Sequence, residues 1–314
     1  MKLITDISQL HADERGASAA LGNFDGLHRG HVAVIETAGA EARRLRAPHA
    51  VVTFEPYPRQ YFRPNDAPFR LMSLRVKARA LEARGLDLLY ALPFDRALAE
   101  LSAEVFAGDV LGRRLALQHV TVGADFRFGK DRGGDIEVLR SIGATRGYGV
   151  TVVEIVTGGS AESGFSSTDV RAAIREGDMR RAGELLGHPW SVDGHVIESD
   201  KRGHAIGFPT INVMLGQYIR PKHGVYAVEI EILNGDPRRF KGVANVGIRP
   251  TFGGGDVLLE VHVFDFEDDV YGHEVIVHFV DFIRAEKKFP GVDALKAQIA
   301  ADCETAKAIL SGGR

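Results

Sequence analysis

Hydrophobic positions in the first part of the chain form short runs that alternate with longer amphipathic stretches. The runs at 50–54, 87–94, 119–123 and 149–156 are largely apolar, which is typical of buried strands. A period near 3.6 residues predicts helices at 31–45, 73–84 and 134–146, one that begins near Ser102, and others between Ser167 and Gly187. Strands that alternate with helices in this way predict an α/β doubly wound parallel sheet.

The pattern changes near Trp190, after which strand-like runs dominate. These runs cover 224–233, 240–248, 256–266 and 274–283, and Asn234-Gly235 between the first two is typical of a hairpin turn. Several such strands predict a small barrel or sandwich. A final helix begins near Val292, with an apolar face formed by Val292, Leu295, Ile299, Cys303 and Ala306. We therefore predict two domains, 1–186 and 187–314.

Composition and charge exclude several classes of protein. The 314 residues are 45% hydrophobic, which is enough for a packed core and excludes general disorder. A net charge of -3 argues against nucleic acid as a partner. Asp6 interrupts the N-terminal apolar run and no run of about 18 apolar residues occurs, so neither a signal peptide nor a membrane span is predicted. The single cysteine, Cys303, allows no internal disulfide and favours a cytoplasmic location.

The segment 22–31, GNFDGLHRGH, carries the first candidate chemistry. It follows a strand of small residues and opens a helix, where glycines and free backbone N–H groups favour an anion. His28 and His31 are three residues apart and therefore share a face of the first turn. Two imidazoles there suit a polyphosphate, although solvated or zinc-binding histidines remain an alternative. Neither a P-loop nor a dinucleotide fingerprint is present.

This segment resembles the HxGH signature of bacterial bifunctional riboflavin kinase/FMN adenylyltransferases, also called FAD synthetases. Three later segments resemble motifs of the same family, in the same order. Residues 53–58 resemble TFxPxP, residues 123–129 resemble GxDFRFG, and residues 166–171 resemble SSTxIR, with Val170 in place of the usual isoleucine. Taken alone, the last of these segments would be interpreted as a helix N-cap.

The resemblance implies an HxGH-type nucleotidyltransferase fold for the first domain and a role for each matching position. The implied ATP phosphate ligands are His28, His31, Ser166, Ser167, Thr168 and Arg171, and the residues shaping the ATP pocket are Asn23, Gly26 and Asp125. The residues implied to line the flavin ring are Pro56, Pro58, Phe62 and Phe128. Core packing stays open as the alternative for the two phenylalanines.

The second candidate site lies in the strand-rich half. In the segment 201–212, KRGHAIGFPTIN, Thr210 and Asn212 alternate onto one face, and a hydroxyl beside an amide oxygen suits Mg²⁺ with phosphate. Turn chemistry is the common alternative for such a pair. Farther on, Glu260 alternates with Leu259 and Val261, so its carboxylate points away from the aliphatic face. Most strand carboxylates of this kind are simply solvated.

This half resembles riboflavin kinase, a β-barrel whose loop motif is GxxxGFPTAN, with Ile211 here in place of alanine. Further matches are 245–252 with NIGxRPTF, 269–272 with DLYG and 284–289 with RxExKF. The resemblance implies that Phe208, Thr210 and Asn212 bind ATP, the last two through Mg²⁺, and that Arg284 contacts the flavin. Glu260 would be the general base on the ribityl hydroxyl of riboflavin.

Together these features predict an enzyme that phosphorylates riboflavin to FMN in its C-terminal half and adenylylates FMN to FAD in its N-terminal half. The expected small molecules are riboflavin, FMN and ATP with Mg²⁺, and self-association is not predicted. One alternative is an HxGH nucleotidyltransferase for another substrate, with a barrel that only binds flavin. Another is a flavin-responsive regulator without catalysis. Glu260, Thr210 and Asn212 argue against the first alternative. The two histidines, His28 and His31, and the SSTxxR segment argue against the second, because a regulator that only binds flavin would not need an ATP site.

Overall fold

The computed structural model describes residues 1–154, 165–197, 208–233, 238–248, 257–266, 268 and 270–312. Its contacts divide the chain into two compact units. The first unit comprises residues 1–66 and 77–166, and the second comprises 67–76 and 167–314. Segment 67–76 and the helices after residue 166 therefore pack with the strand-rich half. The boundary of separately active domains at 186/187 stays a prediction.

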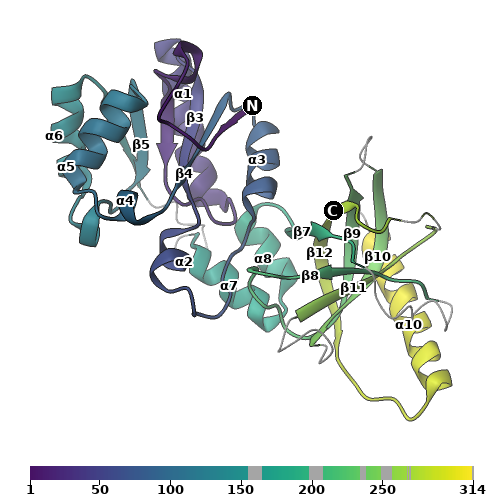
Figure 1. The fold of residues 1–314 in the computed structure, drawn as a ribbon. Helices are drawn as coiled ribbons and strands as arrows, with labels where there is room; N and C mark the ends of the chain where they lie inside the picture. The colour runs from purple at the N-terminus through teal and green to yellow at the C-terminus, as the bar shows by residue number, and fades with distance from the viewer. Residues whose placement is uncertain are drawn as a thin grey trace. The chain divides into compact units, whose positions relative to one another are not determined.

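The first unit is built on a six-stranded parallel sheet (Figure 1). In spatial order its strands are β1 (Lys2–Ile4), β4 (Leu88–Pro93), β3 (His49–Glu55), β2 (Ser18–Leu21), β5 (His119–Gly123) and β6 (Gly149–Val153). The helical segments are η1 (Ala12–Glu14), α1 (Arg29–Leu45), α2 (Pro58–Phe62), α3 (Leu74–Glu82), α4 (Arg96–Ala99), α5 (Ala103–Val105), η2 (Phe106–Arg114), η3 (Lys130–Arg132) and α6 (Ile136–Arg146). The predicted doubly wound parallel sheet is confirmed.

Alternate side chains of β2 show why helices cover both faces of this sheet. The hydroxyl of Ser18 donates to the carbonyl of Ala38 on α1, at 2.8 Å. Its neighbour Ala19 points to the other face, into a buried cluster that includes Phe106 and Leu111 of η2. Figure 1 shows α5 and α6 beside β5. The helix predicted to begin near Ser102 is confirmed, since Ser102 caps α5, and after one α-turn the chain continues as the π-helix η2.

The second unit is an antiparallel six-stranded barrel. In spatial order its strands are β7 (Trp190–His195), β12 (Glu274–Ala285), β9 (Gly224–Ile232), β10 (Arg238–Ile248), β11 (Val257–Val263) and β8 (Ile211–Met214). Just beyond β7, the Ile197 N–H donates to the Asn212 carbonyl on β8 at 2.9 Å. This bridge brings the first and last strands together, so the barrel is nearly closed and the predicted antiparallel barrel is confirmed.

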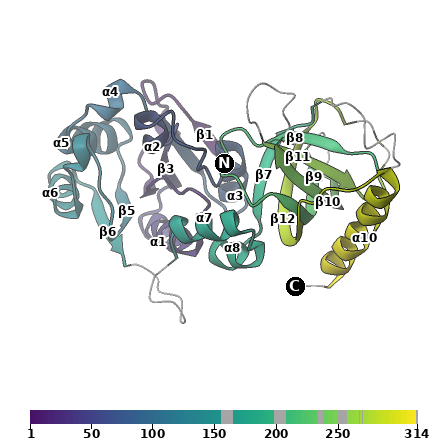
Figure 2. The same cartoon turned by 90° about the horizontal axis from the view of Figure 1, so that it is seen from below.

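In the described part of the second unit, the helices that accompany the barrel are α7 (Ser167–Glu176), α8 (Met179–Leu186) and α10 (Val292–Ser311). Helix α10 lies along the barrel beside β9 and β10 (Figure 2). Cys303 and Ala306 on its predicted apolar face are buried against Val225 and Val243. The predicted start of the helix at Val292 is confirmed, and the Val292 side chain in the first turn is 56% exposed.

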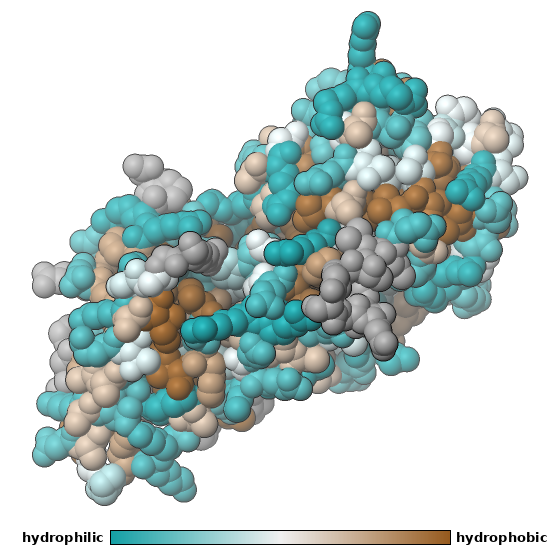
Figure 3. Space-filling view, turned by 180° about the vertical axis from the view of Figure 1, so that it is seen from behind, coloured by the Kyte–Doolittle hydropathy of each residue, from teal (hydrophilic) through white to brown (hydrophobic). Residues whose placement is uncertain are grey.

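Some predictions fall on residues that the structure does not describe. The hairpin pair Asn234-Gly235, the loop 201–207 and the motif residues 249–252 lie outside the described residues. Among the described residues, six large hydrophobic side chains are exposed: Leu3, Phe62, Val105, Ile248, Tyr271 and Val292. On the face shown in Figure 3, brown hydrophobic areas are bordered by teal hydrophilic side chains. No helix in the described part of the chain is long and apolar enough to span a membrane.

Candidate functional sites

The first candidate site lies where the strand order of the parallel sheet reverses direction. From β2 the chain proceeds to β3 on one side, and it later returns to place β5 on the other side of β2. Loops that leave the carboxyl ends of strands at such a switch point form the usual ligand crevice of open α/β sheets. The segment 22–28 leaves β2 and the segment 124–128 leaves β5, so the fold brings Asn23, Gly26 and Asp125 to one edge.

The loop 22–28 has an unusual backbone that ends in a histidine cap. Phe24, Gly26 and Leu27 have φ angles of 49°, 88° and 48°, which is the left-handed region that side chains disfavour. His28 then caps α1, because its Nδ1 accepts from the His31 N–H at 3.3 Å. The two imidazole rings stack with centroids 3.5 Å apart and planes at 20°. The predicted shared face is confirmed, whereas the phosphate role of the two histidines stays a prediction.

The space around position 30, between the two histidines, favours a glycine. A Cβ at this position would lie 3.2 Å from the His28 ring and 3.4 Å from the Phe165 carbonyl oxygen. The first distance is tighter than ordinary van der Waals contact, and the second is at its lower limit. A side chain here would therefore press on the His28 ring that stacks on His31.

The sequence analysis missed a buried lysine beneath this loop. Lys77 on α3 has 0% exposure, and its ammonium donates to the Asn23 carbonyl oxygen at 2.7 Å and to the Thr53 hydroxyl at 3.1 Å. The ammonium also lies 4.7 Å from the centre of the Tyr57 ring, whose hydroxyl donates to Asp25 Oδ1 at 3.1 Å. A sequence indication existed, because Lys77 is four residues before the buried Leu81 and so falls on the apolar stripe of the helix.

The residues predicted to line the flavin ring differ in exposure. Pro56 and Pro58 are half-buried where β3 leads into α2. Phe62 is 63% exposed, with its ring 5.7 Å from that of Phe94. Phe128 is buried in the core cluster and stacks on Phe126 with ring centroids 5.6 Å apart. Phe128 therefore packs in the core, as the alternative interpretation expected, whereas Phe62 does not.

The residues of the SSTxxR segment lie at the beginning of α7. Ser166 precedes the helix, Ser167 opens it, and Thr168 is exposed. Within the second unit, Arg171 Nε donates to the Phe69 carbonyl oxygen at 2.9 Å, and its guanidinium carbon lies 5.5 Å from the centre of the Phe69 ring. Segment 67–76 thus fixes the orientation of this arginine.

The second candidate site is a cavity of about 730 Å³ in the second unit. Four residues predicted from the sequence line it together: Phe208, Thr210, Glu260 and Arg284. They come from segment 208–210 and from β11 and β12, which are consecutive in the chain but are separated by β9 and β10 in the sheet. A cavity of this size is in the range of small-molecule sites, so the barrel places these side chains around one ligand-sized space.

Strand register places Glu260 between two asparagines. On β11, Glu260 is opposite Asn212 of β8 on one side and opposite Asn245 of β10 on the other. Residues directly opposite on neighbouring strands project from the same face of a sheet. Asn212 is fully buried, with its Nδ2 3.4 Å from the Thr210 carbonyl oxygen, and Asn245 lines the cavity. The sequence analysis quoted Asn245 within a motif but did not include it among the site residues.

Apolar side chains also line the cavity, and some of them come from α10. Leu295 and Ile299 of the helix line it together with Val225 and Val243 of the barrel. A nearly buried ion pair also joins helix and barrel, since Arg284 donates through Nε to Asp302 Oδ1 at 2.9 Å and through Nη2 to Oδ2 at 2.6 Å. This two-point contact fixes the Arg284 side chain at the edge of the cavity.

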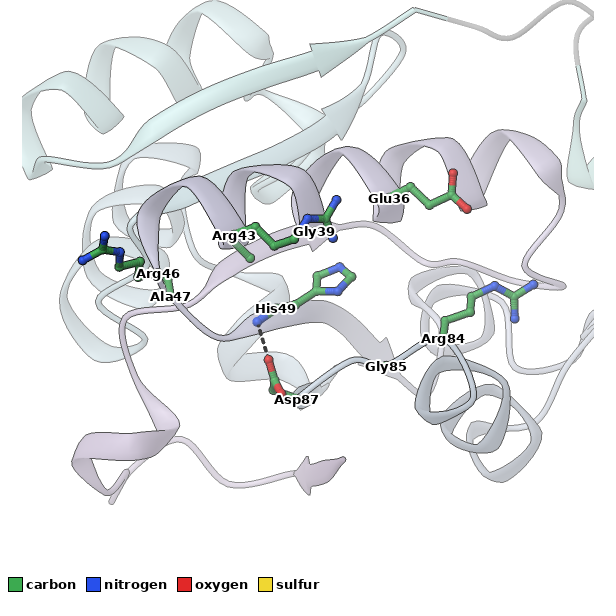
Figure 4. A pocket seen from close by; sticks show the side chains of 10 residues that line it. Glu36, Gly39, Arg43, Arg46, Ala47, His49, Arg84, Gly85 and Asp87 are labelled. Carbon is green, nitrogen blue, oxygen red and sulfur yellow. Dashed lines mark hydrogen bonds between the residues drawn. The ribbon is translucent and has the colours of Figure 1, made fainter.

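The first unit also contains a smaller pocket of about 340 Å³ that none of the predicted site residues lines (Figure 4). It lies near the amino end of β3, at the sheet edge opposite to the loop 22–28. In its centre, the His49 backbone N–H donates to Asp87 Oδ2 at 2.8 Å, and burial lowers the pKa of the His49 ring. In the described part of the chain, no three His, Cys, Asp or Glu residues form a potential metal cluster.

Comparisons with known proteins match both halves of the chain. A family model described as FAD synthetase matches residues 10–169, and one described as riboflavin kinase matches residues 186–310. A protein named bifunctional riboflavin kinase/FMN adenylyltransferase from Haemophilus influenzae is 40% identical over 99% of this chain and 100% of its own length. A protein of the same name from Escherichia coli is 42% identical over 98% of this chain and 97% of its own.

A solved structure also matches along the whole chain. It is a crystal structure from Streptococcus pneumoniae, described as a macrolide-efflux protein. It has a TM-score of 0.82 and 32% sequence identity, and the match covers 98% of each chain. A protein of known structure is therefore similar to this chain over both the parallel-sheet unit and the barrel unit.

Proposed function

The chain belongs to the family of bifunctional riboflavin kinase/FMN adenylyltransferases, and on this premise we propose which of its residues perform each half-reaction. The C-terminal region phosphorylates riboflavin to FMN, and the N-terminal region adenylylates FMN to FAD. Both activities occur in the names of relatives that align over nearly the whole chain. A barrel that binds flavin without catalysis is therefore not supported.

The gathering of Glu260, Thr210 and Arg284 around one cavity is the observation that carries the kinase proposal. The ribityl 5′-hydroxyl oxygen of riboflavin attacks the γ-phosphorus of ATP, and the bond to the ADP oxygen breaks. Glu260 accepts the hydroxyl proton as the new P–O bond forms. The apolar wall formed by Val225, Ile299 and their neighbours suits the flat flavin ring.

The donor set beside Glu260 fits a divalent cation that accompanies ATP. Thr210 and Asn212 offer a hydroxyl and an amide oxygen, which are hard oxygen ligands, and Asn212 is directly opposite Glu260 in strand register. We therefore assign Mg²⁺ to these two residues. When bound, the ion neutralises phosphate charge. The single cysteine, Cys303, is free and buried, and we propose a cytoplasmic location on this ground.

For adenylylation, a phosphate oxygen of FMN attacks the α-phosphorus of ATP, and pyrophosphate leaves. No proton has to be removed from the attacking oxygen, so the main requirement is orientation and charge stabilisation. The stacked His28 and His31 at the start of α1 suit this role, because imidazole N–H groups and the helix N-terminus favour negative charge. Asn23, Gly26 and Asp125 are proposed to shape the nucleotide pocket at the same sheet edge.

The test is product chromatography with the purified full-length chain. Riboflavin, ATP and Mg²⁺ should give FMN and then FAD, whereas FMN supplied directly should give FAD without the kinase step. Chelation of divalent metal should stop FMN formation, and added Mg²⁺ should restore it. Undiminished FMN formation in excess chelator would contradict the metal assignment, and FAD formation from riboflavin by the Glu260→Gln variant at the normal rate would contradict the proposed base.

A further inference from the structure

We propose that Lys77 is a positioning residue for FMN adenylylation, and that it acts by holding the Asn23 carbonyl at the start of the loop 23–28. Lys77 lies 54 residues after Asn23 along the chain, and its ammonium reaches the carbonyl oxygen at 2.7 Å. The inference rests on the proposed role of His28 and His31 in binding the ATP phosphates. It concerns the support beneath that pair, because Lys77 itself has 0% exposure.

Burying the Lys77 ammonium costs free energy of hydration, and an apolar side chain could fill the same space without that cost. Removing a charged group from water is unfavourable unless hydrogen bonds replace its hydration. Val76 and Leu81 on the same helix are buried, so an aliphatic side chain would suit this environment for packing alone. The lysine instead donates to Asn23 and Thr53 and lies 4.7 Å from the centre of the Tyr57 ring. These contacts indicate that the side chain is present here for its hydrogen bonds and not only for packing.

The loop above Lys77 needs such a support. Phe24 and Leu27 have φ angles of 49° and 48°, and non-glycine residues keep this conformation only where the surroundings impose it. At the far end of the loop, His28 is fixed by the N-cap contact with His31. At the near end, Lys77 and the Thr53 hydroxyl, which lies 3.0 Å from the same oxygen, hold the Asn23 carbonyl. The loop is thus held at both ends.

A second contact supports the middle of the loop. The Tyr57 ring that faces Lys77 donates its hydroxyl to Asp25 Oδ1 at 3.1 Å, and Asp25 is buried. Lys77 therefore contacts the loop directly through Asn23 and contacts the residue that holds Asp25. Displacement of a reacting group by about 1 Å can lower a rate by about 10²-fold. Loss of the ammonium should therefore act on the catalytic step.

The experiment measures both half-reactions in full-length Lys77→Met, Thr53→Val and the double variant. Methionine keeps the length and apolar stem of lysine and removes the charge, and valine keeps the shape of threonine and removes the hydroxyl. Riboflavin phosphorylation in the same molecules reports the folding of the second unit only. Urea unfolding of the first unit and the KM for FMN in adenylylation report whether that unit stays intact, so a fall in kcat is not read as loss of fold. The control is Arg84→Met, which removes an exposed cation seven residues farther along the chain.

We expect Lys77→Met to lower kcat for FMN adenylylation by about 10²-fold, with riboflavin phosphorylation within twofold of the wild type. Thr53→Val should have a smaller effect, and the double variant should lose less than the product of the single losses, because both side chains act on one carbonyl. Arg84→Met should match the wild type.

Three results would overturn the inference: adenylylation by Lys77→Met within threefold of wild type, a parallel loss of both half-reactions, or fully multiplicative losses in the double variant. The histidine variants separate this failure from that of the proposed function. If His28→Ala and His31→Ala leave FAD formation unchanged, the proposed phosphate site fails. If they abolish FAD formation while Lys77→Met does not, only the role of Lys77 fails.

Discussion

The two candidate sites are built from different kinds of backbone. The adenylyltransferase site uses loops at the end of a parallel sheet, with left-handed residues and a buried lysine below. The kinase site uses neighbouring strands, where register alone places Asn212, Glu260 and Asn245 in one row. A strand-built site needs few special supports, because the hydrogen-bond ladder already fixes each side chain. A loop-built site needs separate anchors for its backbone.

The largest expected effect concerns the strand-built site. Glu260→Gln keeps the side-chain size but cannot accept a proton at neutral pH, so kcat for riboflavin phosphorylation should fall by about 10²–10⁴-fold. Adenylylation of supplied FMN should not change. The measurement is kcat for each half-reaction. Glu229→Gln on β9, which does not line the cavity, is the matched control. Phosphorylation within a few-fold of wild type would show that Glu260 belongs only to the polar face of its strand.

At the loop-built adenylyltransferase site, substitutions should affect the other half-reaction, which is FAD formation. His28→Ala or His31→Ala removes one preorganised donor, which typically lowers kcat by about 10²–10³-fold. FAD formation should therefore collapse while FMN formation continues. His11→Ala, at an exposed position of the same unit, serves as the control. If FAD is made at the normal rate in both active-site variants, the histidine pair has no part in adenylylation.

The junction of α10 with the barrel allows a test of stability at the kinase site. Asp302→Asn leaves Arg284 with a neutral partner, and breaking a buried ion pair costs on the order of 3 kcal/mol in the free energy of unfolding. The exposed Glu304→Gln, two residues away, should change that free energy by less than about 1 kcal/mol. Urea unfolding of the second unit measures both variants. Equal stability of the two would mean that Arg284 and Asp302 contribute no more than a surface pair.

The smallest expected effect concerns separation of the two activities. Fragment 187–314 should phosphorylate riboflavin, and fragment 1–186 should convert FMN to FAD.

In the intact chain the Trp190 Nε1–H donates to the Leu71 carbonyl oxygen at 2.9 Å, and Leu71 is buried. Fragment 1–186 lacks Trp190, so its FAD-forming activity should be half lost at a temperature roughly 5 °C lower than in the intact chain. An unchanged inactivation temperature would show that the contact of Leu71 with Trp190 contributes nothing to this stability.

Hydrophobic periodicity in the sequence was sufficient to predict the two kinds of architecture. Continuous apolar runs between helical patterns predicted the parallel sheet, and alternating runs after Trp190 predicted the barrel strands. The direction of Glu260 also followed from alternation, because successive strand residues point to opposite faces. The shared face of His28 and His31 followed from helical spacing, and the structure added the stacking of their rings. These features depend on neighbours in the chain, so local pattern is enough to predict them.

Other features were decided only by the tertiary structure. Lys77 meets Asn23 and Thr53 across 54 and 24 residues of chain, and no local pattern records such a pairing. The same holds for Asp302 at Arg284 and for the row that joins Asn245 to Glu260. The π-helical course of η2 and the packing of segment 67–76 with the barrel were likewise missed. Each of these depends on which distant surfaces meet when the core closes. The packing of the core determines which distant segments come into contact, and local propensity and hydrophobic periodicity do not encode these contacts.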